Sequence, residues 1–438
     1  CRREQADLPG VEDDLAAAEA AAAALADPVL RARVALARGE LVEVAGDTVA
    51  ARAAYQRALH QLDERAADTD GQVVVADAHA RLGHALRREG ELGAAAATIA
   101  RAAATYQQLG HRDGDGAMAY EAGVIALFAR DLVGARRWFE RARTIAVELG
   151  HRPQIAAAAS GLGILEQALG DLPGAIAHHV HAVSEFRDLG NRHREGSALY
   201  YLAGAYLELD QSIEARALLL QAAAAVDAVG AARYQALITG AQVAALALLG
   251  DTAAATAALA DAERRVAACP DEPALAATVA IHACHLRWST DAAVVAQRVA
   301  EARALAERTP GDDPAWAARV IARRAGDRTA PGPQLRVALD GGEVRVPGAD
   351  APIDLRRRAP LRRILLALVE RRLQAPGEAL TQDELVAAGW PGEYISHGAA
   401  SNRLHVALST LRSLGLRPYL DSGEHGYRLA PGIAVTRG

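Results

Sequence analysis

The chain has 438 residues and a formal net charge of −6; hydrophobic residues make up 51% of it and aromatic residues only 4%. This length exceeds what one compact core normally supports, so several domains or a repeat array are expected. All 48 basic residues are arginine. The absence of lysine excludes a Walker-type phosphate loop and Schiff-base chemistry within this chain, because both need lysine.

The number and spacing of the cysteines indicate the redox state of the compartment. Cys1, Cys269 and Cys284 are too few and too scattered for a disulfide framework, which favours a reducing, cytoplasmic environment. No apolar run approaches the roughly 20 residues that span a bilayer. Because the chain opens at Cys1, two interpretations of this end stay open: a fragment boundary, or the lipid-bearing cysteine of a processed lipoprotein.

Internal repetition with a period of forty residues dominates the chain up to about residue 325. A mostly small residue recurs in the first helix of each predicted unit, followed by a turn and an Ala-x3-large-x2-Ala pattern. The series runs Gly39, Gly83, Gly123, Gly163, Ala203, Val243 and Ala283. Glycine inside a helix costs about 1 kcal/mol relative to alanine, so its recurrence predicts a partner helix that approaches too closely for a Cβ atom.

The second helices carry matching triplets, among them Ala95/Ile99/Ala102 and Ala135/Phe139/Ala142. These units resemble the tetratricopeptide (TPR) repeat family in a forty-residue form. For residues 1–325 the resemblance implies a mainly α fold, an α-solenoid of about seven helix pairs whose first helices line a concave groove that binds a peptide or protein. Residues 10–27 are interpreted as the second helix of a truncated unit, and residues 314–325 as a closing helix.

Side chains three before and one or four after the small residue are expected to face this groove. They are His84, Arg87, Tyr120, Gln167, Tyr200 and Arg287. The alternative is that each of them is an ordinary solvated surface residue. Residues 1–330 hold 34 arginines and 43 acidic residues, a net charge of −9, which favours a basic or neutral partner over nucleic acid for this region.

Two histidine clusters, HHVH at 178–181 and HACH at 282–285, have the spacing of residues that share a helix face. His179, however, falls at the packing position that Phe139 holds in the preceding unit. We therefore predict no metal site and no cofactor. The sequence shows no strand–turn–helix nucleophile elbow, and solenoids seldom enclose a pocket, so the chain is predicted not to be an enzyme.

Beyond residue 325 the pattern changes. The segment GDRTAPGPQ interrupts the helices and is interpreted as a linker, residues 326–334. Alternation with period two predicts a small antiparallel sheet from segments 335–339, 343–346 and 352–355. Thr381 and Glu384 have the spacing of a capping box. Helices are expected at 360–373, 382–388 and 398–413, a hairpin at 419–429, and a tail at 432–438.

Residues 335–431 resemble the winged-helix effector domain of OmpR/PhoB-type response regulators, on the stretches LTQDELVAAGW, NRLHVALSTLR and GYRL. The resemblance implies that the helix at 398–413 enters the major groove of DNA while the hairpin approaches the adjacent backbone. It assigns DNA binding to Asn402, Arg403, His405, Ser409, Thr410, Arg412, His425 and Arg428.

This resemblance has two departures. Ser409 and Thr410 stand where arginines are common in the family, and Gly423-Glu424 replaces what is usually an Arg-Gly pair, so base readout by arginine is thinner. Residues 331–438 hold 14 arginines and 11 acidic residues, a net charge of +3. Much of that positive charge lies around the first helix of the unit, and these arginines either hold backbone phosphates or form a solvated face. They are the arginines at 356–358, Arg362, Arg363, Arg371 and Arg372.

These observations favour a cytoplasmic, bacterial-type transcription regulator. Its solenoid senses or docks a peptide or protein partner, and its winged helix binds double-stranded DNA, as a homodimer on paired half-sites. An upstream NTPase or kinase module is a further partner that we consider. Two alternatives stay open: a TPR scaffold whose winged helix mediates protein–protein contacts without DNA binding, and a lipid-anchored envelope protein that starts at Cys1.

Overall fold

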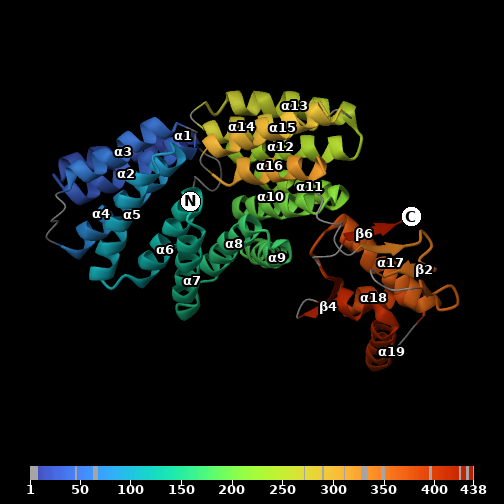
Figure 1. The fold of residues 1–438 in the computed structure, drawn as a ribbon. Coiled ribbons are helices and arrows are strands. Elements are labelled where there is room, and N and C mark those ends of the chain that lie inside the picture. The colour runs from blue at the N-terminus through green and yellow to red at the C-terminus, as the bar shows by residue number, and fades with distance from the viewer. Residues whose placement is uncertain are drawn as a thin grey trace.

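The computed structural model describes residues 8–44, 47–62, 68–270, 272–288, 291–309, 311–326, 334–346, 351–393, 397–423, 426–430 and 434–437. Two units follow one another along the chain: a helical array up to Arg324 and a smaller α+β unit from Gln334 (Figure 1). The chain is mainly helical, as the sequence predicts. Cys1, His425 and most of the predicted linker lie outside the described residues.

The array consists of consecutive helix pairs, as the forty-residue period predicts. Each helix packs on its partner in the pair and on the next helix along the chain. In the part of the chain described, seven pairs follow one another: α2 (Pro28–Val44) with α3 (Thr48–Gln61), α4 (Thr69–Arg88) with α5 (Leu92–Gln108), α6 (Arg112–Phe128) with α7 (Leu132–Glu148), α8 (Arg152–Leu169) with α9 (Leu172–Asp188), α10 (Arg192–Glu208) with α11 (Ser212–Asp227), α12 (Ala232–Leu248) with α13 (Thr252–Ala267), and α14 (Pro273–Ala283) with α15 (Ala292–Arg308).

The recurring glycine marks the point where the two helices of a pair touch. A Cβ atom built on Gly123 would lie 2.6 Å from the ring of Phe139. The same atom on Gly163 would lie 2.6 Å from the ring of His179, so His179 takes the packing position that the repeat register assigns to it. Close packing leaves no room for a methyl group here. The sequence signature of the repeat is therefore a packing requirement between paired helices.

In the turn inside a helix pair, one residue ends the first helix and the next residue caps the second. Gly170 ends α8 with φ 86°, a left-handed conformation that glycine adopts without a Cβ penalty. Asp171 then accepts a hydrogen bond from Gly174 N at 3.0 Å and caps α9. In the turn before α7, Arg130 takes the place of the glycine with φ 62°, which costs roughly 1–2 kcal/mol relative to the right-handed region.

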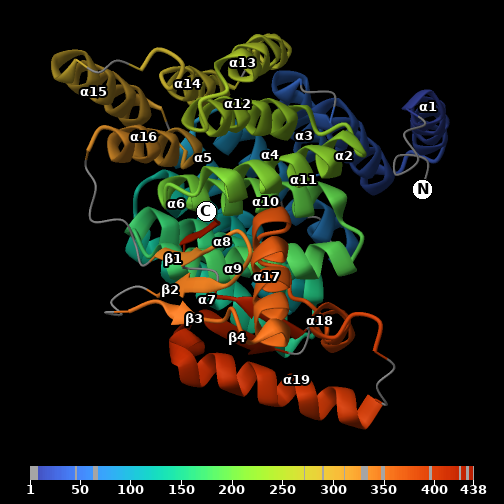
Figure 2. The ribbon, with the colours of Figure 1, turned by 90° about the vertical axis from the view of Figure 1, so that its right-hand side faces the viewer.

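The array curves until its last helices lie beside its first ones (Figure 1). Arg88, at the end of α4, forms an ion pair with Glu272, the N-cap residue of α14. A Cβ atom on Gly311 would lie 3.7 Å from the ring of Phe128 on α6. Two further helices flank the seven pairs: α1 (Leu8–Ala24) precedes them, and α16 (Asp313–Arg324) folds back against α14, α15 and α10 (Figure 2).

The α+β unit opens with a sheet. Strands β1 (Gln334–Val337), β2 (Glu343–Arg345) and β3 (Ile353–Asp354) pair antiparallel, near the predicted positions. A fourth strand, β6 (Ala434–Arg437), pairs with β1 in parallel and completes the order β3-β2-β1-β6. Within the predicted tail at 432–438, the described strand β6 covers the free edge of β1 and buries Val435, so this part of the segment belongs to the sheet.

Helices α17 (Ala359–Gln374), α18 (Gln382–Gly389) and α19 (His397–Leu411) follow the sheet, close to their predicted limits. The capping box of Thr381 and Glu384 is formed at the start of α18. A π-helical turn, η2 (Arg412–Leu416), and a short 3-10 helix, η3 (Arg417–Tyr419), lead into the hairpin of β4 (Leu420–Gly423) and β5 (Gly426–Leu429). Leucines of α17 and α19 meet the sheet in a core of the unit's own.

Candidate functional site

Five of the six residues expected to face the groove lie on the first helices of their pairs, whereas Arg287 lies in the turn after α14. His84 Nδ1 lies 2.9 Å from Glu43 Oε1 on the neighbouring α2. The guanidinium of Arg87 lies 5.2 Å from the ring centre of Phe128, a cation–π distance. Arg287 is exposed. His84 and Arg87 thus connect α4 to its neighbours α2 and α6.

The other three lie deeper. Tyr120 is half-buried, and burial raises the pKa of its hydroxyl. Gln167 is buried and donates a hydrogen bond from Nε2 to Glu208 Oε1 at 2.8 Å. Tyr200 is fully buried because Trp316 of α16 stacks edge-on against it, with ring centres 5.4 Å apart. Gln167 and Tyr200 are therefore covered by the chain itself.

Polar contacts hold α16 against α10 and α12. Arg319 forms two hydrogen bonds to Glu208 on α10, from Nε to Oε2 at 2.9 Å and from Nη2 to Oε1 at 3.0 Å. Asp313 Oδ2 accepts a hydrogen bond from Arg233 Nη2 on α12 at 2.7 Å. Both carboxylates are almost fully buried, so these charge-assisted bonds lie in a region that water screens poorly.

An ionic chain continues from this contact to the start of the array. Arg233 also donates from Nε to Glu272 Oε2 at 2.8 Å, and Glu272 in turn pairs with Arg88 of α4. Burial alone would raise the pKa of Glu272, but the charges of Arg233 and Arg88 lower it. Arg88 donates further to Glu43 of α2 at 3.3 Å. Helices from both ends of the array are therefore joined through alternating charges.

The two histidine clusters serve packing. Burial lowers the pKa of His179 and of His282 to about 3, so both rings are neutral at physiological pH. The ring of His282 lies 5.0 Å from that of Trp316, and Arg324 Nη1 lies 3.1 Å from His285 Nδ1. Among the described residues, no three candidate ligands gather where a metal ion would be held. His282 and His285 of the HACH cluster instead contact side chains of α16.

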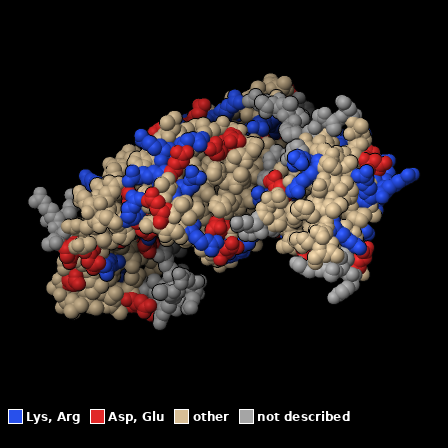
Figure 3. Space-filling model, turned by 90° about the horizontal axis from the view of Figure 1, so that it is seen from below, with Lys and Arg blue, Asp and Glu red and all other residues tan. Residues whose placement is uncertain are grey.

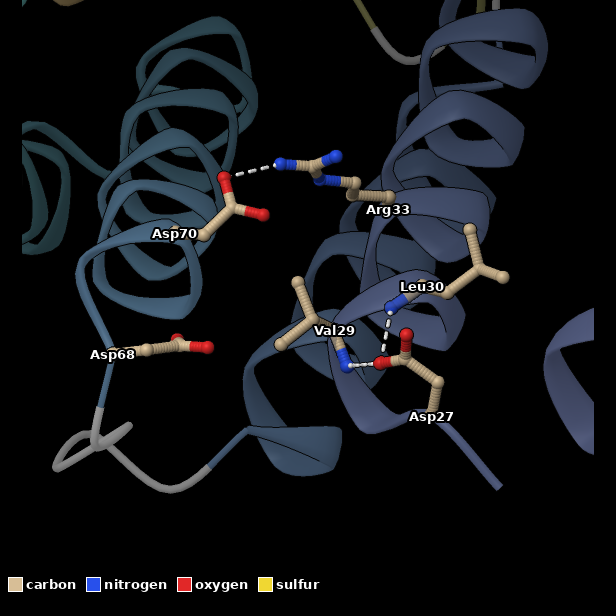
Figure 4. Close-up of a pocket in the computed structure, with 6 residues that line it drawn as sticks. All are labelled: Asp27, Val29, Leu30, Arg33, Asp68 and Asp70. Atoms are coloured by element: carbon tan, nitrogen blue, oxygen red, sulfur yellow. Dashed lines mark hydrogen bonds and ion pairs between the residues drawn. The ribbon is translucent and has the colours of Figure 1, made fainter. Parts of the chain in front are cut away.

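A shallow pocket opens where α2 and α4 begin (Figure 4). It is lined by Asp27, Val29, Leu30, Arg33, Asp68 and Asp70. Each carboxylate there has a structural partner. Asp27 accepts from Val29 N at 2.9 Å, Asp68 from Gly71 N at 2.8 Å, and Asp70 from Arg33 Nη2 at 2.6 Å. The two caps and the ion pair stabilise helix ends and leave this pocket without an acid–base pair poised for catalysis.

In the α+β unit, one face of α19 is turned away from the array (Figure 2). Asn402, His405 and Ser409 are exposed along it, at positions that helical geometry places on one side. Val406 lies among them with 66% of its surface exposed. Thr410 is half-buried, and its hydroxyl donates back to Val406 O at 2.7 Å. The exposed face is thus polar, with one apolar side chain at its centre.

The arginines expected to bind DNA are partly occupied. Arg403 donates from Nη1 to Glu393 at 2.7 Å. Arg428 donates from Nη1 to Gly377 O at 3.0 Å, which ties the hairpin to the segment after α17. Arg412 is half-buried at the end of α19. Figure 3 views the α+β unit, at the right, from the side of α19, and there the surface is mostly uncharged, with basic and some acidic side chains around its margin.

Further arginines lie in the turn between β3 and α17. Arg356, Arg357 and Arg358 are exposed, and Arg356 donates to Glu343 at 3.1 Å. Arg357 and Arg358 enlarge the positive charge of the unit near the N-terminus of α17. The structure thus places an exposed basic segment outside the predicted recognition helix.

The two units meet at a buried arginine, Arg372, for which the sequence left phosphate binding or a solvated face open; neither interpretation is correct for it. Arg372 of α17 is 3% exposed; its guanidinium lies 4.6 Å from the ring centre of Tyr206 on α10. It donates to the Tyr206 hydroxyl and, at 3.2 Å, to Gln211 Oε1. At the edge of the same interface, Arg187 of α9 pairs with Glu378 at 2.7 Å. Arg372 continues the apolar stripe of α17, three residues after Val369 and four after Leu368, and this spacing is the sequence signal that could have indicated its burial.

Comparison with solved structures finds two helical-repeat proteins whose fold is similar to that of the array. The chain is similar to the Rap conjugation gene regulator of plasmid pLS20 in complex with the Phr* peptide, with a TM-score of 0.52 and 16% identity over 69% of this chain and 78% of that one. It is also similar to a Rap protein complexed with the competence and sporulation factor, with a TM-score of 0.50 and 14% identity over 68% of this chain and 76% of that one. The array is therefore a TPR-like solenoid.

Other comparisons bound this statement. No protein-family model matches the chain. No curated protein matches it either. Among the helices described, none combines the length and the apolar character needed to cross a bilayer.

Proposed function

We propose that this chain is a bacterial-type transcription regulator. Its TPR-like array docks a peptide or protein partner, and its α+β unit is a winged helix that binds double-stranded DNA through α19. The observation that carries the DNA part is the exposed face of α19, which lies beside the hairpin β4–β5 and points away from the array. The unit stays docked on the array through α17, so this face is free for a duplex in the docked form.

Element order supports the winged-helix interpretation. Three helices follow a small sheet, and a two-stranded hairpin closes the unit; Leu380 pairs with Tyr427 and adds a further segment to that hairpin. In this arrangement the third helix enters the major groove and the hairpin approaches the backbone. Asn402, His405 and Ser409 then meet base edges or phosphates, while the exposed Val406 side chain contacts a thymine methyl group.

The peptide-docking part rests on the array. Solved structures of similar fold are complexes, one with the Phr* peptide and one with the competence and sporulation factor. Helix α10 contacts α16 through Tyr200 and Glu208 and contacts the α+β unit through Tyr206. A change in the array around Tyr200 and Glu208 therefore acts on α10, the same helix that contacts the α+β unit.

The proposal also makes the chain non-catalytic and cytoplasmic. Its described pocket holds helix caps and an ion pair instead of reacting groups. Regulation of DNA binding requires access to the nucleoid, and the buried, reduced Cys269 suits a reducing compartment. Control by an upstream NTPase or kinase module and binding of paired half-sites by a homodimer belong to the same proposal.

The test is DNA binding by the full chain at several salt concentrations. Random duplexes are selected on the immobilised protein, and the enriched sequence is then titrated between 50 and 200 mM salt, where a protein with six to ten phosphate contacts loses roughly 10³–10⁵ in affinity. The triple change Asn402→Ala, His405→Ala and Ser409→Ala is expected to relax the selected sequence. Arg264→Ala, on the exposed surface of α13, is the control and leaves it unchanged.

Two results would defeat the DNA part. One is the absence of any salt-dependent affinity for duplex in the full chain. The other is a triple variant that selects the same sequence with the same affinity as the unaltered chain.

A second candidate function has its own observation. Val406 is largely exposed and Arg403 is paired with Glu393, so the face of α19 also fits a protein surface, which would make the chain a scaffold. In that case Val406→Glu abolishes capture of a protein partner, while Arg412→Ala leaves regulation untouched. Salt-dependent duplex affinity that is lost in the α19 triple variant excludes this candidate.

A further inference from the structure

One basic surface of the α+β unit lies outside the face of α19. It is the outer face of the sheet formed by β3, β2 and β1, together with the turn that leads from β3 into α17. Leucines and valines that alternate along β1 and β2 point into the core of the unit, so the residues between them point outward. Five exposed arginines lie on this surface, and we call them the sheet arginines: Arg336, Arg345, Arg356, Arg357 and Arg358.

Two of the sheet arginines face each other across the ladder. Arg336 of β1 and Arg345 of β2 are directly opposite partners in the antiparallel pair. Side chains in such positions have Cβ atoms about 5 Å apart, and like charges there are destabilising. Glu343 lies 3.3 Å from Arg345 and 3.1 Å from Arg356, and Asp354 lies 4.0 Å from Arg356. Arginines thus outnumber carboxylates on this face, an arrangement that an anionic ligand stabilises.

The chain holds the basic turn in a fixed position. Leu355 is fully buried in the core of the unit and anchors the turn. Asp354 Oδ1 accepts a hydrogen bond from Arg356 N at 2.9 Å, and Leu355 O accepts one from Arg358 N at 2.9 Å. The stem of Arg356 packs on the β1–β2 turn, where a Cβ atom on Gly342 would lie 3.0 Å from Arg356 Cγ. Arg356 therefore meets a ligand with its backbone and stem already ordered, which lowers the entropy cost of binding.

This surface begins where α19 ends. The π-helical turn η2 follows α19 directly, and a Cβ atom on its Gly415 would lie 3.9 Å from Cδ1 of Ile353 in β3. Figure 2 shows β3 beside that end of α19, with β2 and β1 following toward the array. Arg417, in the next short helix, is exposed as well. A basic surface therefore continues from the C-terminal end of α19, across the edge strand β3, onto the outer face of the sheet.

The spacing on this surface fits a phosphate backbone. Neighbouring strands lie about 4.8 Å apart, so β1 lies roughly 10 Å beyond β3. One strand of a duplex presents a phosphate about every 3.4 Å along the helix axis, hence about three phosphates over that length. The planar guanidinium group matches phosphate oxygens in a bidentate way. Contacts of this kind position a duplex and carry no sequence information.

We propose that the sheet arginines form a second nucleic-acid surface, which binds the phosphate backbone of the duplex where that duplex continues past the C-terminal end of α19. The ligand is a run of phosphates, and base sequence plays no part in its recognition. Continuity with the face of α19 favours the backbone of the same duplex over an acidic protein segment. This inference rests on the DNA-binding part of the proposed function and adds a site that extends the length of duplex covered by the chain.

The test uses the full chain and the duplex enriched in the selection described above. In the double variant Arg345→Gln with Arg357→Gln, the slope of log K against log salt is expected to flatten by roughly 1.8, because each lost phosphate contact removes about 0.9. Binding at about 100 mM salt should weaken by roughly tenfold or more, while the selected sequence stays the same.

Two further double variants serve as controls. Arg264→Gln with Arg308→Gln removes the same charge from exposed positions on α13 and α15, and the slope is expected to match that of the unaltered chain. Arg345→Lys with Arg357→Lys keeps both positive charges on the sheet surface and is expected to retain the slope. Loss of slope in either control would show that net charge or misfolding, and not the proposed contacts, causes the effect, and would overturn the inference.

The length of the duplex gives an independent measurement. Base pairs outside the selected sequence are removed stepwise from the ends of the duplex. The unaltered chain is expected to lose affinity by roughly tenfold as these flanks shorten, because the sheet arginines lose their phosphates. The glutamine double variant is expected to bind long and short duplexes alike. Each comparison changes the duplex and keeps the protein, so a difference in folding between variants does not affect it.

The outcomes separate this inference from the proposed function. A chain without salt-dependent duplex affinity refutes both. Duplex affinity with the same slope and the same flank dependence in the unaltered chain and in the glutamine double variant refutes this inference alone. A labelled polyglutamate peptide tests the other class of ligand. If that peptide binds the unaltered chain and not the glutamine double variant, while the duplex slope is unchanged, the surface binds acidic protein segments and the inference is overturned.

Discussion

Replacement of Arg372 by alanine is expected to separate the α+β unit from the array without unfolding either one. Arg372 is the buried cation of their interface, where it stacks on Tyr206 and donates to Gln211. The neighbouring Arg371 points within its own unit and pairs with Glu378 and Glu384. Arg371→Ala is therefore a control of equal size and charge, one residue away.

The magnitude follows from the interactions that the Arg372 guanidinium makes. A hydrogen bond from a charged donor contributes roughly 1.5–3 kcal/mol, and a desolvated cation–π pair about 2 kcal/mol. Removal of the buried cation also removes its desolvation cost, so the docking free energy is expected to fall by about 3 kcal/mol. That change is roughly a hundredfold in the docking equilibrium.

Hydrogen exchange with mass spectrometry reads this equilibrium. Amides from Tyr206 to Gln211 and those of α17 are expected to exchange at least tenfold faster in Arg372→Ala, while Arg371→Ala stays within twofold of the unaltered chain. The radius of gyration in solution should increase only in the first variant. If exchange at the α10–α11 turn responds equally to both changes, the reasoning that one buried arginine holds the interface is refuted.

Three further predictions concern the array and are measured by urea unfolding. Gly163→Ala forces a methyl group against His179 and is expected to lower the free energy of unfolding by about 1–3 kcal/mol. Gly93→Ala is the control: a Cβ atom there meets nothing within 4 Å, so the free energy of unfolding should rise by about 0.5–1 kcal/mol. Equal effects of the two changes would contradict the packing role of Gly163. Burial raises the pKa of Asp312 from 3.8 to about 6, so its contribution is fully present below pH 4 and is lost as pH rises through 6. Asp312→Asn is therefore expected to add about 3 kcal/mol at pH 7.5 and little at pH 4, and a gain of the same size at both pH values would rule this out. Glu272→Gln removes the charge between two arginines of α4 and α12 and is expected to cost about 3 kcal/mol, with no such loss for a surface control such as Glu263→Gln.

Much of the array could be predicted because its information is local and repeated. A mostly small residue in the first helix, a turn and a large residue in the second helix recur along the array, with glycine at the first of these positions in four units. Gly163 and His179 show the strength of this signal, since register alone assigned the histidine to packing instead of metal binding. The capping box at Thr381 is likewise a short-range pattern, and the structure confirms it.

The contacts between distant segments could not be predicted in the same way. Arg319 and Glu208 are far apart in sequence, and nothing beside either residue indicates the pair. The closing helix was expected, but its contact with α10 depends on the curvature that the whole array accumulates. Strand β6 was missed for a similar reason: its partner β1 lies at the other end of the unit, and four residues carry too little alternation to indicate a strand.

The contact between Arg88 and Glu272 has a consequence for how this molecule tolerates change in length. In an open solenoid a module can be inserted or removed, since each one meets only its neighbours. Here the curved array contacts itself through this ion pair, so an added or deleted repeat would move Glu272 away from Arg88. The number of repeats is therefore fixed by geometry, and lengthening the array by design would first require removal of the contact between Arg88 and Glu272.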